Sequence, residues 1–213
     1  VGQYLVDEFN IKEEQLGVVS GPCHAEEVAL ERLSYLTIAA LDEFKAKTVA
    51  DCLACNFINT KISNDIFGTE YGAILKNIYA VAAGIAHGLG YGDNFHAVLM
   101  SNAIREMNDI LKQVNKTKRQ INDSAYLGDL LVTGYSNFSR NRTFGNMIGK
   151  GYSVQSVIME MNMVAEGYYA TKGVAILNEG YKIKAPIIHA VYSILYEGKN
   201  AGKTMKELSM KLD

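Results

Sequence analysis

Residues 71–86 read YGAILKNIYAVAAGIA, and their apolar side chains recur at every third or fourth position. This spacing predicts a helix that turns one broad apolar face toward a core. Lys76 stands inside that pattern, between Leu75 and Ile78. A lysine that loses solvation at such a position can serve as an acid or base near neutral pH. Alternatively, Lys76 extends its amine to water from the edge of the apolar face.

The sequence on the C-terminal side of this helix keeps a helical pattern. Apolar residues follow helical spacing over 95–114, where Asp93 is the expected N-cap, and again over 154–177. Pro186 suits the first turn of a helix that runs to about residue 197. Residues 204–207, TMKE, form a capping box that would open the last helix. We therefore expect residues 63–213 to form an all-α domain.

The sequence on the N-terminal side alternates between strand-like and helical patterns over residues 1–62, which is typical of a parallel or mixed sheet with helical crossovers. Two or three strands make only part of a doubly wound domain, so we predict an α/β, partial Rossmann-type segment here. The expected strands are 16–20 (a buried one), 35–40 and 56–60, and the expected helices are 1–9, 24–31 and 43–54.

The composition excludes several classes of protein. The chain has 213 residues, a net charge of −2 and 21% charged residues, which gives no electrostatic case for nucleic-acid binding. We interpret the basic run at 112–119 as a solvated helix end or loop. The most apolar stretch, 78–86, is about half as long as a membrane span, and no signal peptide opens the chain. Three cysteines, an odd number, favour a reducing, cytoplasmic location over a disulfide framework.

Two polar clusters interrupt the helical part. Asp129 lies in the apolar run YLGDLLVT (126–133), where a buried carboxylate needs a partner. Lys76 is one candidate for that partner, and the alternative is that Asp129 caps a helix beginning at Leu130. In the run 139–142, SRNR, a serine cap, a helix start and an arginine fork suit a phosphate, whereas the alternative is a solvated turn.

Other sequence features give weaker indications of function. Glu166 can accept a hydrogen bond from a ribose hydroxyl, or it is a surface glutamate. The glycines of 84–92 follow a helix rather than a strand, so they do not make a dinucleotide fingerprint. A lone C-x-x-C at 52–55 and four scattered histidines give no metal-ligand spacing, and we expect no metal.

Taken together, these clusters resemble the bacterial NAD(P)-dependent glycerol-3-phosphate dehydrogenases. The similarity covers nearly the whole chain, with several motifs in one order. The resemblance implies a helical domain like the C-terminal domain of 6-phosphogluconate dehydrogenase. The motifs are SGPCHAEEV at 20–28, LKN at 75–77, AAGIA at 82–86, GYGDN at 90–94, LGDL at 127–130, SRNR at 139–142, FG at 144–145 and EG at 166–167.

The resemblance also implies an activity, namely hydride transfer between NAD or NADP and glycerol 3-phosphate or dihydroxyacetone phosphate, which feeds glycerophospholipid synthesis. Lys76 matches the catalytic lysine that exchanges a proton with the C2 oxygen. We also expect a homodimer, without membrane insertion. The expected substrate contacts are Gly21, Cys23, Lys76, Asp129, Ser139, Arg140 and Asn141, and the expected cofactor contacts are Ala25, Arg140, Val164 and Glu166.

Two departures from the family accompany this resemblance. Cys23 stands where the family usually has serine or threonine, so a thiol replaces a better hydrogen-bond donor. No G-x-G-x-x-G occurs, and we expect roughly 100 further residues, with a second substrate-binding lysine, upstream of Val1. The chain alone would then bind its ligands poorly. The alternatives are a non-catalytic helical module that dimerises or binds a phosphorylated metabolite, and a related dehydrogenase for another hydroxy acid, against which the cation at Arg140 argues.

Overall fold

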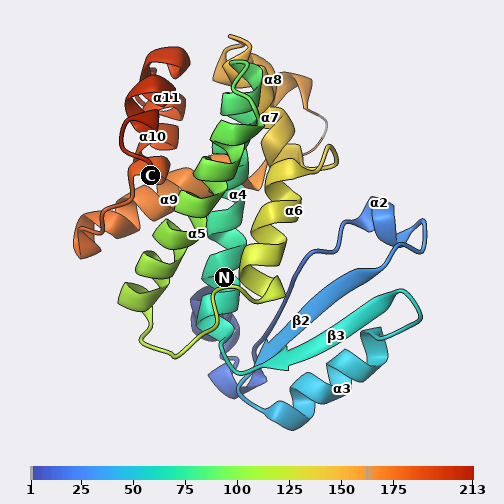
Figure 1. Cartoon of the computed structure of the whole chain (residues 1–213). Coiled ribbons are helices and arrows are strands. Elements are labelled where there is room, and N and C mark those ends of the chain that lie inside the picture. Colours follow the sequence, from blue (N-terminus) through green and yellow to red (C-terminus); the bar gives the residue numbers. More distant parts are fainter. Residues whose placement is uncertain (1, 162, 164) are drawn as a thin grey trace. The chain divides into compact units, whose positions relative to one another are not determined.

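The computed structural model describes residues 2–161, 163 and 165–213 and divides into two compact units (Figure 1). The first unit comprises residues 2–73 and 117–129, and the second comprises residues 74–116 and 130–213. Helix α4 (Ile66–Gly88) has residues in both units.

The first unit contains a three-stranded mixed sheet, as predicted. The strands follow the order β1 (Gly17–Ser20), β2 (Ser34–Ala40) and β3 (Ile58–Ser63). Strand β2 pairs with β3 in parallel and with β1 in antiparallel orientation. The prediction of a buried strand at 16–20 is wrong in one respect, because only Ser20 of β1 is buried. Strand β1 is short and lies at the edge of the sheet, which leaves its other side chains partly exposed.

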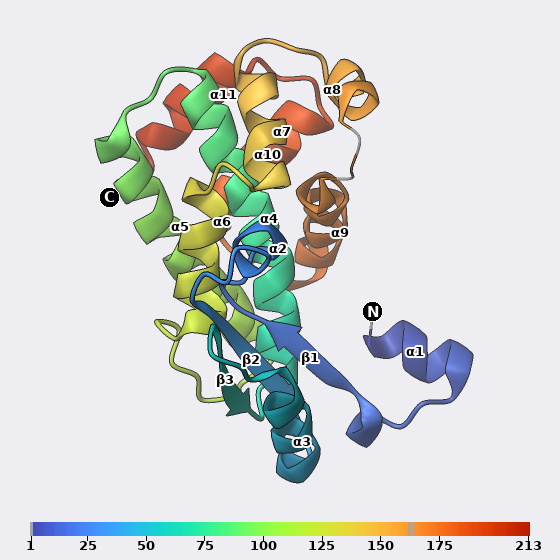
Figure 2. The same ribbon diagram turned by 90° about the vertical axis from the view of Figure 1, so that its right-hand side faces the viewer.

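Four short helical segments lie between residues 2 and 53 of the first unit, and α3 packs against β2 and β3 (Figure 2). The core between α3 and these two strands consists of small and branched side chains, which let helix and sheet approach closely. Asp42 begins α3 by accepting hydrogen bonds from the amides of Phe44 and Lys45. The segments are α1 (Gly2–Phe9), the 3₁₀ turn η1 (Glu13–Gln15), α2 (Ala25–Val28), which is shorter than predicted, and α3 (Glu43–Leu53). The core residues are Leu36, Ile38, Ala40, Ala46, Ala50 and Ile62.

The second unit is helical in its described residues, as predicted. Helix α4 carries its apolar face at the centre, where Leu75, Ile78, Val81 and Ile85 are all buried. The N-cap of α5 is Gly92 rather than the expected Asp93, which is already the first helical residue. The helices after α4 are α5 (Asp93–Val114), α6 (Asp129–Tyr135, whose first residue belongs to the first unit), α7 (Arg140–Gly149), α8 (Val154–Glu160), α9 (Glu166–Tyr181), α10 (Pro186–Leu195) and α11 (Ala201–Ser209).

Helices α4 and α7 touch through glycines on both sides. A Cβ atom on Gly84 would overlap the carbonyl oxygen of Arg142, and one on Gly145 would overlap that of Val81. Gly88 and Gly149 are equally close to backbone of the opposite helix. Gly84 and Gly88, two glycines of the stretch 84–92, thus serve close helix packing.

A buried carboxyl group supports the start of helix α10. Ala185, the N-cap residue, has no side-chain acceptor to offer. Instead, Glu106 of α5 accepts hydrogen bonds from the amides of Ile187 at 2.9 Å and Ile188 at 3.1 Å. Burial raises the pKa of Glu106 to about 7, although these two hydrogen bonds oppose the shift. The first turn of α10 therefore depends on a carboxyl group from another helix.

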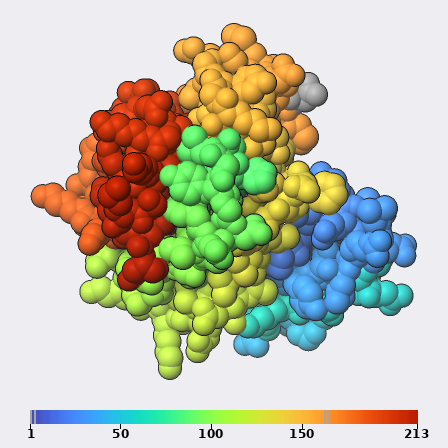
Figure 3. Space-filling model, turned by 45° about the horizontal axis from the view of Figure 1, so that its top comes forward, coloured from blue at the N-terminus to red at the C-terminus, as the bar shows by residue number. Residues whose placement is uncertain are grey.

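The C-terminal helix α11 begins earlier than predicted. Asn200 is its N-cap and accepts a hydrogen bond from the amide of Lys203 at 2.9 Å, so the capping box predicted at 204–207 is wrong. The C-terminal residues lie against α5, red against green in Figure 3, and Asn102 Nδ2 donates to the carbonyl oxygen of Asp213 at 2.8 Å. No helix within residues 2–161, 163 and 165–213 combines the length and apolarity needed to cross a membrane.

Candidate active site

The polar sequence at 139–142 forms the N-terminus of helix α7, as predicted. Ser139 is buried and caps the helix, with its Oγ accepting from the amide of Arg142 at 3.3 Å. Arg140 is the first helical residue, and its side chain is exposed. Arg142 donates to Asn137 Oδ1 at 3.0 Å. The helix start thus presents one guanidinium to the surface beside its first backbone amides.

Asn141 joins the start of α7 to the start of α9. Its buried side-chain oxygen accepts a hydrogen bond from the amide of Gly167 at 2.8 Å. Gly167 also lies so close to the carbonyl oxygen of Asn77 on α4 that a Cβ would overlap it. Three separate segments of the second unit therefore converge on one point, at Asn77, Asn141 and Gly167.

Of the four polar features singled out in the sequence, at Lys76, Asp129, 139–142 and Glu166, three adjoin this convergence in the chain. Lys76, Arg140 and Glu166 are the immediate chain neighbours of the contacting residues. Lys76 is half-buried on α4, and Glu166 is exposed in the first turn of α9. The expected cofactor contact Val164 lies outside the described residues.

The fourth cluster, at Asp129, belongs to the first unit. Its carboxylate is buried and accepts hydrogen bonds from Ser20 Oγ at 3.1 Å and from the amide of Gly21 at 3.3 Å. The alternative in which Asp129 caps a helix from Leu130 is wrong, because α6 already includes Asp129. The predicted pairing of Asp129 with Lys76 joins residues of different units and stays a prediction.

Asp129 is bonded to the turn that carries the expected substrate contacts Gly21 and Cys23. Gly21 has a positive φ of 138°, and a Cβ there would overlap the carbonyl oxygen of Tyr35, so only glycine suits this position. Cys23 is a half-buried free thiol, and Ala25, the expected cofactor contact, is exposed at the first residue of α2. Gly21, Cys23 and Ala25 thus occupy one short segment after β1.

The first unit also holds a buried ion pair that the sequence pattern does not predict. Arg119 Nε donates to Asp65 Oδ2 at 2.7 Å, and its Nη2 donates to Oδ1 at 3.1 Å. These side chains are only 3% and 6% exposed, so the solvated reading of the run 112–119 is wrong for Arg119. Burial alone would raise the pKa of Asp65, but hydrogen bonds from Arg119, Tyr126 and Gly68 lower it on balance. Asp65 directly precedes a helical pattern, which marks it as a cap, but no sequence signal marks its partner.

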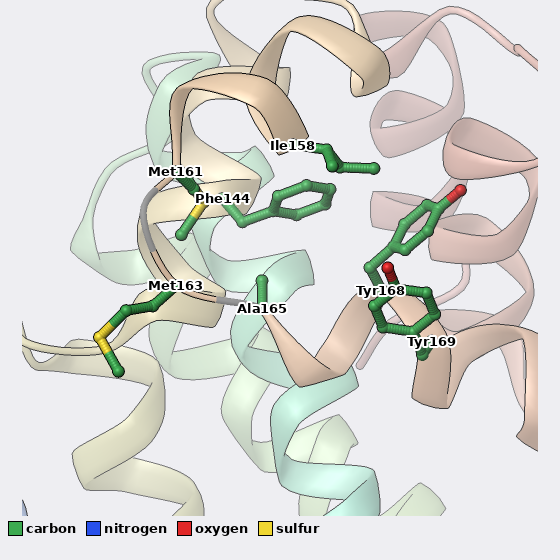
Figure 4. A pocket seen from close by; sticks show the side chains of 7 residues that line it. All are labelled: Phe144, Ile158, Met161, Met163, Ala165, Tyr168 and Tyr169. Carbon is green, nitrogen blue, oxygen red and sulfur yellow. The ribbon is translucent and has the colours of Figure 1, made fainter.

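A pocket of about 110 Å³ lies between α7, α8 and the start of α9 (Figure 4). Phe144, Ile158, Tyr168 and Tyr169 point toward it, and the rings of Phe144 and Tyr168 are 5.9 Å apart. Met161 and Met163 line the pocket, whereas Met159 is 86% exposed. With this lining the pocket suits an apolar group and supplies no ionised one. Its lining residues are Phe144, Ile158, Met161, Met163, Ala165, Tyr168 and Tyr169.

Comparison with known proteins matches residues 65–206 to the family model of the NAD-dependent glycerol-3-phosphate dehydrogenase C-terminus. A glycerol-3-phosphate dehydrogenase [NAD(P)+] of Bacillus pumilus is 38% identical over 201 residues, which are 94% of this chain and 58% of that protein. One from Staphylococcus aureus is 36% identical over 193 residues, covering 91% of this chain and again 58% of the relative. The chain therefore spans somewhat more than half the length of these curated relatives.

Solved structures agree with the fold. Glycerol-3-phosphate dehydrogenase from Coxiella burnetii superposes with a TM-score of 0.87 at 30% identity, over 90% of this chain and 59% of that one. The enzyme from Saccharomyces cerevisiae gives a TM-score of 0.83 at 22% identity, over 97% and 62% of the two chains, which shows the fold alone.

A small mixed sheet followed by an all-helical part is the fold class that the chain shares with these structures. The chain belongs to the NAD-dependent glycerol-3-phosphate dehydrogenase family, whose C-terminal model covers most of its length.

Proposed function

We propose that the whole protein interconverts sn-glycerol 3-phosphate and dihydroxyacetone phosphate with NAD or NADP. The observation that carries this proposal is the convergence of Asn77, Asn141 and Gly167, whose neighbours are Lys76, Arg140 and Glu166. A lysine, an arginine and a glutamate that adjoin these contacts in the chain match what a phosphorylated carbonyl compound and a nucleotide require. Family membership supports the same reaction.

The start of α7 binds the substrate phosphate in this proposal. Ser139 caps the helix through the amide of Arg142, and the other amides of the first turn remain directed toward the helix end. Arg140 adds a planar, permanently charged fork that suits phosphate oxygens. Asn141, held by Gly167, contacts the substrate from the same turn.

Lys76 handles the proton of the reaction. During reduction the C2 carbonyl carbon gains a hydride and its oxygen gains the proton of the Lys76 ammonium group; oxidation reverses both transfers. The positive charge of Lys76 also stabilises the developing alkoxide. In the first unit, Asp129, Gly21 and Cys23 supply the remaining substrate contacts.

The proposed cofactor contacts fit a dinucleotide in chemistry. Glu166 is exposed at the start of α9, where a carboxylate can accept from a ribose hydroxyl. Arg140 suits a phosphate, and Ala25 is small and exposed. Val164 completes the proposed set. The nicotinamide ring, when bound, supplies or accepts the hydride.

We also propose a domain organisation and a cellular role for the whole protein. Residues 1–62 would be the C-terminal part of a Rossmann-like domain, and residues 63–213 the substrate-binding and catalytic domain. We place the enzyme in the cytoplasm, in glycerophospholipid synthesis.

The central test is Lys76→Ala in the complete enzyme. We expect kcat to fall by at least about a hundredfold, since the proton transfer loses its partner, while circular dichroism shows an intact fold. Lys112→Ala removes an exposed lysine of α5 and should leave the rate unchanged. A Lys76→Ala enzyme with near-normal turnover would contradict the proposed function.

The proposed homodimer has a separate test. Sedimentation equilibrium of the complete enzyme should give twice the mass of one chain at micromolar concentration. A single-chain mass throughout that range would contradict a dimer and leave the catalytic proposal standing.

A further inference from the structure

Asp65 stands at the centre of a buried network in the first unit. Its Oδ1 accepts the amide of Gly68 at 2.9 Å, which caps helix α4, as well as one arm of the Arg119 fork. Its Oδ2 accepts the other arm at 2.7 Å and the hydroxyl of Tyr126 at 2.6 Å. One carboxylate thus ties together a helix start and two positions of the returning segment 117–129.

Tyr126 lies in an unusual piece of backbone. Residues Ser124–Gly128 form a single turn of π-helix, η2, which leads directly into Asp129. Such turns are rare and occur often at functional sites. Burial and the hydrogen bond to Asp65 raise the pKa of Tyr126 to about 12, which keeps its hydroxyl a donor at ordinary pH.

Asp129 is only three residues beyond Tyr126 in the chain. It holds the end of β1 through Ser20 and Gly21, and a Cβ on Gly128 would be in van der Waals contact with Pro22. Any shift of the π-turn would therefore move both the carboxylate and the Gly21–Cys23 segment that it anchors. All of these contacts lie within the first unit.

We propose that Asp65, Arg119 and Tyr126 are positioning residues for substrate binding, because they hold the π-turn from which Asp129 fixes the Gly21–Cys23 segment. This inference rests on the proposed function, since it requires that segment to contact substrate. None of the three residues needs to touch the substrate itself.

The same segment offers a matched control. Lys61 of β3 pairs with Asp123 at 2.9 Å, immediately before the π-turn, but the two side chains are 58% and 40% exposed. Exposed pairs of this kind contribute little to stability. Lys61→Ala therefore removes a tether from the surface of the segment and leaves the buried network intact.

The experiment uses Tyr126→Phe in the complete enzyme, because this change removes the hydroxyl and keeps the ring. Hydrogen exchange followed by NMR should show the amide of Gly21 exchanging about tenfold faster, the effect of losing one charge-assisted hydrogen bond. The KM for glycerol 3-phosphate should rise by about three- to tenfold, with kcat and the KM for cofactor near the wild-type values. Lys61→Ala should match the wild type in all of these measurements.

A double-mutant cycle separates positioning from general loosening. If Tyr126 acts through Asp129, Tyr126→Phe will not raise KM further in an Asp129→Asn background. Additive effects would overturn the inference. So would unchanged exchange at Gly21, or faster exchange with an unchanged KM. If Tyr126→Phe does not fold, Arg119→Lys carries the same test, since it keeps the charge and loses the fork.

Failure of the proposed function gives a different result. In that case the wild-type enzyme does not oxidise glycerol 3-phosphate, or Lys76→Ala turns over normally, whatever Tyr126→Phe does. The positioning inference fails alone when the wild type and Lys76→Ala behave as expected and Tyr126→Phe binds substrate normally.

Discussion

Arg140 occupies the end of helix α7 where the helix dipole is positive, a position that disfavours a cation. Its exposed side chain makes the charge tolerable in water. The arrangement becomes favourable once an anion lies beside the helix start, since the amides and the guanidinium then act on the same charge. The unfavourable placement is thus itself an argument for an anionic ligand.

We therefore expect Arg140→Ala to raise the apparent KM for glycerol 3-phosphate at least tenfold, because a charge-assisted contact to phosphate is lost. Saturating concentrations of cofactor should lower this raised KM only slightly. Lys150→Ala, at the opposite end of the same helix, removes an exposed cation without this effect. Steady-state kinetics of the complete enzyme make the comparison, and an unchanged KM in Arg140→Ala would exclude Arg140 from the phosphate site.

Single residues were predictable from the sequence where their role is local. Ser139 caps the helix that follows it, and a cap needs only its own first turn. Arg119 could not be assigned in this way, because its partner Asp65 lies 54 positions away and the neighbouring lysines suggest solvent. Residues that act across long chain distances need the tertiary structure.

At the scale of elements, the start of α10 depends on Glu106. The pKa of this carboxyl in the folded protein, about 7, exceeds its usual value of 4.5. The unfolded chain therefore loses its proton at lower pH than the folded one, and stability falls as pH rises from about 4.5 to 7 and stays lower above that.

Glu106→Gln should remove this pH dependence, because glutamine resembles the protonated carboxyl group. Relative to the wild type, we expect the free energy of unfolding of the variant to rise by roughly 2.5 kcal/mol between pH 5 and pH 8, measured by urea unfolding at both values. Glu207→Gln, which alters an exposed glutamate of α11, serves as the control and should show no such gain. A difference that is constant between the two pH values would show that Glu106 is ionised throughout.

Helix boundaries show where sequence patterns mislead at this scale. The run 204–207 has the letters of a capping box, but Asn200 opens α11 one turn earlier. Asparagine is as good a cap as threonine. Asn200 was not recognised in the sequence because a capping box has glutamate or glutamine at the third helical position, where this helix has Lys203. The sequence likewise did not predict that β1 lies at the edge of the sheet, since the order of strands depends on which strands pair in the folded structure.

For the whole molecule, the sequence separated a sheet-containing beginning from a helical remainder correctly. It did not show that residues 117–129 belong to the same unit as the sheet. The segment 117–129 is held in this unit by the buried hydrogen bonds of Arg119 and Tyr126 to Asp65. The spacing of apolar residues in the sequence gives no sign of such polar contacts. The candidate site residues could be proposed from the sequence because they are polar groups in apolar surroundings, a contrast that a linear sequence does display.

The packing of the helical unit depends on the glycine contact between α4 and α7. Gly84→Ala or Gly145→Ala should destabilise the protein by roughly 2–4 kcal/mol, since the added methyl group would overlap backbone. Gly173→Ala in α9 is the matched control, because open space surrounds that position and alanine should stabilise the helix by about 1 kcal/mol. Urea unfolding should therefore give opposite signs, and a shared sign would contradict the close contact.

The same contact has a consequence for the gene. Any change at the first or second base of a glycine codon introduces a side chain or a stop, whereas changes at the third base are silent. At Gly84, Gly88, Gly145 and Gly149 every such side chain would meet backbone of the opposite helix. In a library of random point mutations selected for a working enzyme, these four codons should survive with third-base changes alone, while the codon for Gly173 accumulates alanine and serine.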